Sequence, residues 1–251
     1  RARDRERTRA RAREGKRARA RAKLVLVHVS RPQIQKECSK ALVQGQFHNG
    51  LRITDLEQLA LVQSTVGRQA MQLEARFSMG IANSPMQGSR IRTSRGNFIT
   101  ARPIGVKNGV DFSYTGEVRR VDSQAIGKQL DDGNLVLISC LGYSPTGETF
   151  NLAAAQVAGR VAASLQADKL IVFGADKGIT NSRGEQVAEL LTKAGHRLVH
   201  QHQNSGDSWT DLSMNIDVLS KACDAGVDRG HLLSYQEDGA LLSELFSRDG
   251  S

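Results

Sequence analysis

The sequence predicts an α/β fold in which parallel strands are joined through a helix. Two short apolar runs, at residues 135–138 and 170–173, are typical of strands that are buried on both faces. Between them lie a loop rich in turn residues and then an alanine-rich segment, residues 152–167, whose larger apolar side chains recur at helical spacing. A strand, a loop, a helix and a second strand in this order predict a parallel pair joined by a right-handed crossover.

Length and cysteine content fit a folded intracellular domain. The 251 residues suffice for one α/β domain of ordinary size or for two small ones, and no apolar run approaches the length of a membrane span. The three cysteines, Cys38, Cys140 and Cys223, are scattered and odd in number. We therefore expect buried thiols and a reducing compartment, with the cytoplasm as the location.

The net charge of +9 belongs to one end of the chain. Residues 1–23 contain twelve Lys or Arg and three Asp or Glu, whereas residues 24–251 contain 23 of each sign. We divide the chain into a basic low-complexity tail, 1–23, and a neutral folded part, 24–251. The tail is a basic arm for RNA or anionic surfaces, part of a plastid or mitochondrial transit peptide (with the plastid stroma as the alternative location of the protein), or a translated stretch without function. The neutral folded part gives no indication of nucleic-acid binding.

The first half of the folded part predicts three helices and a set of hairpins. We expect a buried strand at 24–29, a helix from Ser30 to about Val43, and a loop at 45–50. A second helix, capped by Thr54 or Asp55, should run to about Met79. Residues 88–116 alternate apolar with polar side chains between Asn-Gly and Gly-Asn pairs, which predicts short antiparallel hairpins that act as a lid. A strand at 117–121 and a helix from Asp122 to about Leu130 should follow.

The second half predicts further helices around two strands. Asn151 is placed to cap the alanine-rich helix. The remaining elements expected from the pattern are a loop at 174–184, a helix at 185–194, a polar mobile segment at 196–207, a helix at 210–225, a strand at 227–233 and a last helix at 239–246.

Several kinds of catalytic site lack support. The one histidine cluster, His196, His200 and His202, has no nearby Cys or carboxylate pattern, and we predict no metal site. No Gly-x-Ser-x-Gly nucleophile elbow, Walker loop or Gly-x-Gly-x-x-Gly motif after a strand is present. Hydrolysis by an activated serine and nucleotide binding by these loops are therefore not indicated.

Binding of a small anion is better supported. Arg52 stands where a loop meets a helix, and a guanidinium there can hold a carboxylate through two hydrogen bonds. Ser30 and the amides that follow Arg31 lie at the same expected sheet edge, and helix N-termini favour anions. Asn151 is expected at this edge too. Each of these residues can instead be a structural cap or a surface side chain, but together they predict a site for a carboxylate-bearing small molecule.

Ordered motifs along the chain resemble the amino acid kinase family. They are residues 26–34 (LVHVSRPQI), 49–55 (NGLRITD), 116–118 (GEV), 147–151 (GETFN) and 239–250 (GALLSELFSRDG). The Arg-Pro-Gln-Ile form and residues 234–239 (SYQEDG) are similar to the kinase-like, arginine-sensing domain of the N-acetylglutamate synthases rather than to the N-acetylglutamate kinases.

The resemblance implies a three-layer αβα sandwich, with a mostly parallel central sheet, that binds arginine as an effector. In these synthases a separate acetyltransferase domain transfers acetyl from acetyl-CoA to glutamate, the first step of arginine synthesis. In the related kinases the residue at the position of Arg52 holds the acetylglutamate carboxylate, and the residue at Asn151 contacts the substrate. The resemblance assigns Glu244 and Gly250 to the arginine site. It implies a homo-oligomer, acetyl-CoA as a requirement of the intact synthase, and no cofactor for this chain.

Departures from the family pattern argue against catalysis. Active kinases carry Asp where this chain has Ala155, and their first strand, with its Lys and glycine-rich loop, is replaced by the Arg/Ala tail. We therefore expect a fragment that is incomplete at its N-terminal edge, lacks the acetyltransferase domain and binds ligands without catalysing a reaction. An N-acetylglutamate kinase and a basic-arm RNA binder are the alternatives.

Overall fold

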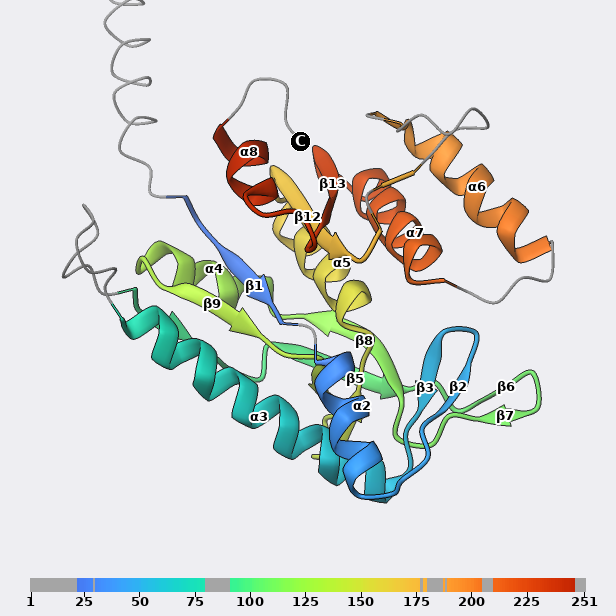
Figure 1. Cartoon of the computed structure of the whole chain (residues 1–251). Coiled ribbons are helices and arrows are strands. Elements are labelled where there is room, and N and C mark those ends of the chain that lie inside the picture. Colours follow the sequence, from blue (N-terminus) through green and yellow to red (C-terminus); the bar gives the residue numbers. More distant parts are fainter. Residues whose placement is uncertain are drawn as a thin grey trace, which may run out of the picture.

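A computed structural model describes residues 22–28, 30–79, 91–176, 178–179, 187, 189–204 and 210–246. Nearly all of the basic tail and Gly250 lie outside these residues. The helices are α2 (Arg31–Lys40), α3 (Leu56–Ser78), α4 (Ser123–Asp131), α5 (Ala154–Leu165), α6 (Thr192–Asn204), α7 (Asp211–Asp224) and α8 (Ala240–Phe246). Figure 1 shows them distributed around a set of strands, with α3 and α5 on opposite sides of strand β9.

Two groups of parallel strands form the centre of the molecule. In the first, β9 (Leu135–Ile138) lies between β1 (Val25–Val27) and β4 (Thr93–Ser94), and it is parallel to both. In the second, β12 (Lys169–Gly174) pairs in parallel with β13 (Arg229–Ser234). The predicted mostly parallel sheet is confirmed.

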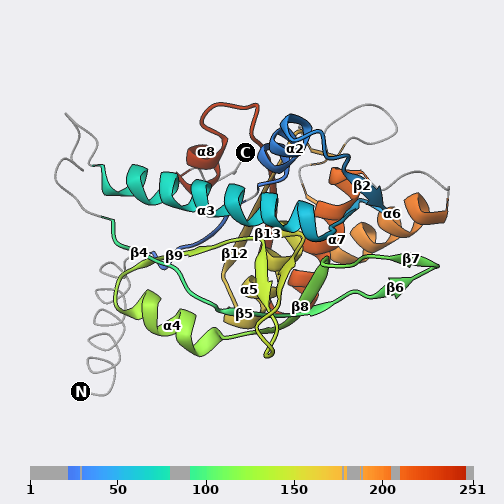
Figure 2. The same ribbon diagram turned by 90° about the horizontal axis from the view of Figure 1, so that it is seen from below.

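Alternate side chains of β9 pack against helices on both faces of the sheet. Val136 and Ile138 belong to a core with helices α4 and α5, whereas Leu135 and Leu137 face Ala70 of α3. All four β9 side chains are buried, as expected for a strand covered on both sides. The three-layer arrangement is therefore present, and Figure 2 shows α3 and α4 on either side of β9.

Smaller sheets surround this centre. Strands β10 (Leu141–Tyr143) and β11 (Thr149–Asn151) form a hairpin, and β10 is parallel to β5 (Ile99–Pro103), which pairs with antiparallel β8 (Gly116–Val121). Strands β6 (Val106–Lys107) and β7 (Val110–Asp111) form the hairpin predicted by Asn108 and Gly109. Both turn residues have positive φ, as a type I′ turn requires.

Caps and boundaries confirm several sequence predictions. The carboxylates of Asp55 and Asp122 accept hydrogen bonds from the backbone N–H groups of Gln58 and Ala125, at the first turns of α3 and α4. Thr210 caps α7 through a capping box with Ser213. Helix α2 begins after Ser30 as predicted, although it ends at Lys40 rather than near Val43.

Four predictions about local structure were wrong. Residues 45–50 are not a loop, because β2 (Gln46–His48) and β3 (Leu51–Ile53) pair as a hairpin around Asn49 and Gly50, both with positive φ. Residues 189–191 are not helical, and residues 196–204, expected to be mobile, belong to helix α6. The predicted parallel pair of 135–138 with 170–173 does not form, because β9 pairs with β1 and β4 while β12 pairs with β13.

Asn151 is not the cap of the alanine-rich helix. It ends strand β11, and α5 begins three residues later, with Ala153 at the N-cap position and no side-chain cap. The amide of Asn151 is instead bonded within the interior, which changes its place in the candidate site.

Candidate carboxylate site

One cavity of about 1830 Å³ brings together Ser30, Arg52 and Asn151, the three residues predicted to bind an anion. Ser30 follows β1, Arg52 is the middle residue of β3, and Asn151 ends β11. Ala153, Ala154 and Ala155 of the α5 N-terminus complete this part of the lining. The three residues therefore line one cavity, although they lie in or next to strands of three different sheets, and their binding of an anion stays a prediction.

Arg52 is the main charged group of this site. Its side chain is buried, with 7% relative exposure, and its Nη2 donates to Gln35 Oε1 at 2.7 Å. Its Nη1 is buried and has no hydrogen-bond partner among the residues that the structure describes. Burial lowers the pKa of Arg52, and the charge of Arg31 lowers it further. A buried cation with an unused donor favours a negatively charged partner.

Phe47 and Gly45 determine where the Arg52 guanidinium lies. The guanidinium carbon of Arg52 is 4.6 Å from the centre of the Phe47 ring, and that of Arg31 is 5.1 Å from the same ring. Such positions over an aromatic ring stabilise a guanidinium. A Cβ at Gly45 would collide with Nη1 of Arg52. Residue 45 must therefore be glycine for the guanidinium to keep this position.

Asn151 is tied to the strand that carries Arg52. Its Nδ2 donates to Thr54 Oγ1 at 3.0 Å, and the Thr115 hydroxyl donates to the Arg52 carbonyl at 2.6 Å. Thr115 Oγ1 also accepts from the Thr54 N–H at 3.0 Å. All four side chains are buried. This network fixes β3 relative to β11, and Asn151 keeps its carbonyl oxygen and second amide hydrogen for other partners.

Ser30 has a mainly structural environment. Its Oγ donates to Gln69 Oε1 of α3 and lies 3.4 Å from His28 Nδ1. Ser30 stands at the N-cap position of α2 but makes no side-chain cap. Nearby, burial raises the pKa of the Cys140 thiol to about 11. Ser30 thus lines the cavity with its hydroxyl already engaged, whereas Arg52 offers an unused donor.

Glu244 lies in a separate cluster. It is buried on α8, and its Oε1 is 2.9 Å from Lys169 Nζ and 3.0 Å from His231 Nδ1. Burial lowers the pKa of His231, although the Glu244 carboxylate opposes this shift. Glu244 does not line the cavity of Arg52. The structure does not place Gly250, so the predicted pairing of Glu244 with Gly250 stays a prediction.

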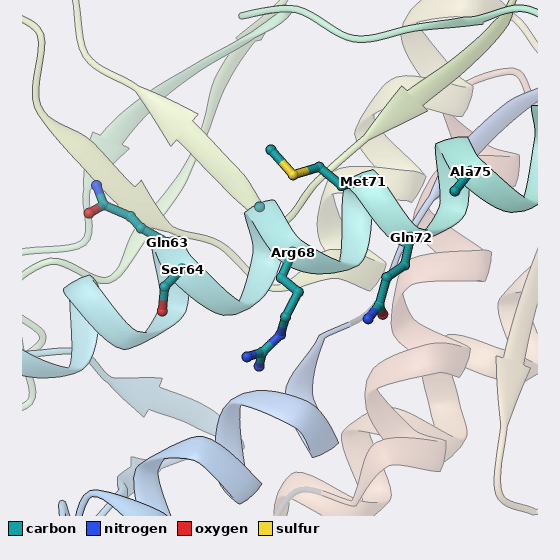
Figure 3. A pocket seen from close by; sticks show the side chains of 7 residues that line it. Gln63, Ser64, Arg68, Met71, Gln72 and Ala75 are labelled. Carbon is teal, nitrogen blue, oxygen red and sulfur yellow. The ribbon is translucent and has the colours of Figure 1, made fainter.

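A second, shallow hollow lies on the outer face of α3. Its lining residues all come from this helix, and Figure 3 shows Arg68, Met71 and Gln72 among them. Arg68 pairs with Glu37 at 3.3 Å. Because no other element contributes polar groups, this hollow is a weaker ligand site than the cavity of Arg52.

Neither a membrane-spanning helix nor a metal site is found among the residues that the structure describes. No helix in this part of the chain has the length and apolar character needed to cross a membrane, and no three His, Cys, Asp or Glu side chains are grouped as metal ligands. His196, part of the histidine cluster considered above, is bonded through Nε2 to Asp224 at 2.6 Å.

Sequence reasoning missed Gln35, Gly45, Phe47 and Thr115. The Asn49-Gly50 pair was an available signal, because such a pair between apolar residues predicts a hairpin and would have placed Phe47 opposite Arg52. Thr115 gave no comparable signal, since a single threonine in a polar stretch has no distinctive pattern.

Comparison with known proteins identifies the family of this chain. The family model described as "Amino acid kinase family" matches residues 2–233. The chain belongs to the amino acid kinase family. This family membership and the kinase-like fold confirm the resemblance inferred from the motifs.

Relatives within the family are acetyltransferases. An amino-acid acetyltransferase of Pseudomonas fluorescens is 51% identical over 225 residues, which cover 90% of this chain and 51% of the relative. That of Azotobacter vinelandii is 50% identical over the same length, again covering 90% of this chain and 51% of the relative. The chain spans about half the length of the curated relatives it matches.

Solved structures of this family are also similar to the chain in fold. The N-acetylglutamate synthase of Neisseria gonorrhoeae, complexed with coenzyme A and L-arginine, superposes with a TM-score of 0.81 and 33% identity, covering 91% of this chain and 52% of that one. A carbamate kinase of Giardia lamblia bound to AMP-PNP has a TM-score of 0.56 and 12% identity, covering 89% of this chain and 81% of that one, and shows likeness of fold alone.

Proposed function

We propose that this chain is the kinase-like, ligand-binding region of an N-acetylglutamate synthase and that it binds amino acids without catalysing a reaction itself. The observation that carries this proposal is the buried guanidinium of Arg52, whose Nη1 has no partner within the described residues. A carboxylate is the partner that fits this donor in shape and charge, because a guanidinium and a carboxylate can form two parallel hydrogen bonds.

Asn151 and the cavity define the ligand class. Asn151 lines the same cavity and retains amide groups beyond its bond to Thr54. The ligand is a small molecule with a carboxylate, such as arginine, glutamate or an acetylglutamate-like compound. Arginine is the effector in this proposal, supported by the complex of the Neisseria gonorrhoeae synthase with L-arginine.

Glu244 is the group assigned to the guanidinium of an arginine effector. Its carboxylate is buried and already close to the cations of Lys169 and, when protonated, His231. Bound arginine would compete with these groups for Glu244, with Gly250 contributing carbonyl oxygens. This effector site is distinct from the carboxylate site of Arg52, and the two are tested separately below.

Phosphoryl transfer receives little support. Ala155, which stands where the family's active kinases carry Asp, lines the cavity near Asn151 and provides no charge there. Transfer of a phosphoryl group depends on positioned charges around the phosphates. The alternative function, an N-acetylglutamate kinase, would require those charges from other residues.

For the whole protein we propose the activity for which its relatives are named, amino-acid acetyl transfer. Acetyl transfer from acetyl-CoA to glutamate, as the first step of arginine synthesis, would take place in a separate domain. The bacterial relatives support a location in the cytoplasm. The outer face of α3, with its small side chains and the exposed Met71, is the surface we assign to a homo-oligomer.

Calorimetry on the purified 251-residue chain tests ligand binding. Arginine, glutamate and N-acetylglutamate are titrated in turn up to millimolar concentration, with circular dichroism to verify that the chain is folded. Heat of binding that is lost in Arg52→Met supports the carboxylate site, and loss in Glu244→Gln supports the effector site. A folded chain that gives no heat with any of the three ligands would disprove the proposal.

A turnover assay distinguishes the non-catalytic, ligand-binding assignment from the kinase alternative. The chain is incubated with ATP and N-acetylglutamate, and ADP release is followed. We expect none, and none from Ala155→Asp either. Sustained ADP release that depends on acetylglutamate would establish the kinase and overturn the non-catalytic assignment.

A further inference from the structure

Two guanidiniums share one aromatic ring in the candidate carboxylate site. The guanidinium carbon of Arg31 is 5.1 Å from the centre of the Phe47 ring, and that of Arg52 is 4.6 Å from the same centre. Both arginines line the cavity. The charge of Arg31 is close enough to lower the pKa of Arg52. A ligand beside Phe47 therefore lies in the field of two cations.

The two guanidiniums differ in their protein partners. Nη1 of Arg31 forms an ion pair with the carboxylate of Asp211, and its Nη2 donates to the carbonyl oxygen of Gly50 at 3.2 Å. Arg52 has a neutral partner instead, because its Nη2 donates to Gln35 Oε1 at 2.7 Å. Its Nη1 is buried without a partner among the described residues. Asp211 thus neutralises Arg31, whereas the charge of Arg52 remains available.

Asp211 reaches Arg31 from a distant part of the chain. It is the first residue of α7, 180 positions after Arg31, and it lines the same cavity. The side chains of Arg31 and Asp211 are 40% and 64% exposed, and ion pairs with this exposure contribute little to stability. The contact therefore affects the charge of the cavity more than it affects the stability of the fold.

The other charged residues of the lining do not change this balance near Phe47. The Asp217 carboxylate pairs with Lys221 Nζ, one turn further along α7, at 2.6 Å. Lys107 lines the cavity from the hairpin of β6 and β7, but it is exposed, and water and salt screen its charge. Two guanidiniums and the one carboxylate of Asp211 are therefore the charges gathered at the ring, and they leave one positive charge in excess.

We propose that Asp211 is a specificity-determining residue, an internal carboxylate on Arg31 that makes the Arg52 site selective for ligands with a single carboxylate. This inference rests on the proposed function, the binding of a carboxylate by Arg52, and narrows its ligand class. One ligand carboxylate matches the remaining positive charge. A second carboxylate near Arg31 would have to displace Asp211, so that one ion pair is lost for each one gained.

Calorimetry with two ligands of the same shape tests the proposal on the full chain. Glutarate has two carboxylates, and monomethyl glutarate has one. The unaltered chain should bind them with affinities equal within about twofold, the factor expected from the two equivalent ends of glutarate. In Asp211→Asn the charge of Arg31 is released, and glutarate should bind about fivefold more tightly than the ester. An unchanged affinity ratio in this variant would overturn the proposal.

Matched variants assign the effect to Arg31. Asp224→Asn removes another exposed carboxylate of α7, one that pairs with His196 outside the cavity, and should leave the affinity ratio unaltered. Arg31→Met combined with Asp211→Asn should abolish the preference for glutarate, whereas Lys107→Met in the same background should retain it. A preference that survives without Arg31 and disappears without Lys107 would place the second carboxylate at the β6–β7 hairpin and refute the role of Asp211.

Failure of this inference can be told apart from failure of the proposed function. If neither ligand binds to the folded, unaltered chain, the carboxylate site itself is disproved, and the selectivity with it. If binding is lost in Arg52→Met but the unaltered chain already prefers glutarate by far more than the factor from its two ends, the carboxylate site stands and the role of Asp211 is refuted. This comparison needs no variant of Asp211, and circular dichroism verifies the folding of every variant used.

Discussion

The Asn151 side chain donates from Nδ2 to Thr54 Oγ1 at 3.0 Å, and this bond joins residues 97 positions apart in the chain. Thr54 is fully buried and follows the strand of Arg52, so the bond connects the end of β11 to the strand that carries the guanidinium. The substrate-contacting position in the resemblance is therefore also part of the framework that positions Arg52.

This bond should be measurable as a coupling energy. Asn151→Ala removes one hydrogen bond to the buried Thr54 hydroxyl, which keeps Thr115 Oγ1 at 3.0 Å, and we expect the free energy of unfolding to fall by about 0.5–1.5 kcal/mol. Thr54→Val should cost a similar amount. Urea denaturation of both single variants and the double variant gives the coupling, expected at about 0.5–3 kcal/mol. Strictly additive losses would show that the two side chains do not depend on each other.

Replacing Arg52 should separate binding from stability. Arg52→Met removes a buried charge but keeps an apolar stem against Phe47, so thermal unfolding should shift little or upward. Affinity for a carboxylate ligand should fall about tenfold to a hundredfold in calorimetry, since a charged hydrogen bond is lost. Arg120→Met, on the exposed side of β8, is the control and should leave affinity unchanged. Equal affinity of Arg52→Met and the unaltered chain would contradict the site.

Gly45 should be required for the same function. A methyl group at residue 45 collides with Nη1 of Arg52, the end of a flexible side chain that can move aside, so Gly45→Ala should weaken ligand binding in calorimetry with little effect on stability. Gly67→Ala serves as its counterpart, because a Cβ at Gly67 meets nothing and alanine favours a helix by about 0.5–1 kcal/mol. We expect weaker ligand binding in Gly45→Ala and unchanged binding in Gly67→Ala; equal affinity of the two variants would refute the steric explanation.

Two histidines, the buried His28 and the half-buried His231, should make stability depend on pH. Burial lowers the pKa of His28 and His231 from the ordinary value of 6.5; Arg95 lowers that of His28 further, while near His231 Lys169 and Arg229 act against Glu244. The unfolded chain therefore binds protons on these groups at a higher pH than the folded chain. Their contribution to stability is complete above about pH 6.5 and is lost as the pH falls through the lowered values.

Urea denaturation at about pH 7.5 and about pH 5.5 measures this dependence. The midpoint should be lower at the acidic pH, and the difference should shrink when His28 and His231 are both replaced by Gln. A pH difference that is unchanged in the double variant would assign the effect to other groups.

Much of the fold could be predicted because the relevant signals are local. Asp55, Asp122 and Thr210 begin helices through bonds to backbone groups a few residues away, and residues 135–138 form a buried strand because their apolar run is continuous. Strand neighbours, in contrast, depend on contacts across the whole chain. The placement of β9 and β12 in separate groups of paired strands therefore had no local signal.

Prediction of the candidate site was limited in the same way, because its contacts join residues that are distant in the sequence. Ser30, Arg52 and Asn151 were expected at one edge and do line one cavity, but the role of Asn151 as a helix cap was wrong. Its bond to Thr54 and the position of Phe47 beside Arg52 require the hairpin and the sheet to be assembled first. No sequence pattern indicates that Nη1 of Arg52 is buried without a hydrogen-bond partner among the described residues, because burial depends on the three-dimensional packing.

The rate at which the buried thiol of Cys140 is alkylated can report local opening of the structure beside Ser30. Since its pKa is about 11, almost none of it is thiolate near neutral pH, and alkylating reagents attack the thiolate. Labelling of Cys140 must then wait for β9 and the cavity wall to open, while the less buried Cys223 is within reach earlier. The ratio of the two labelling rates would report how often the edge beside Ser30 opens, and how far a bound ligand slows that opening.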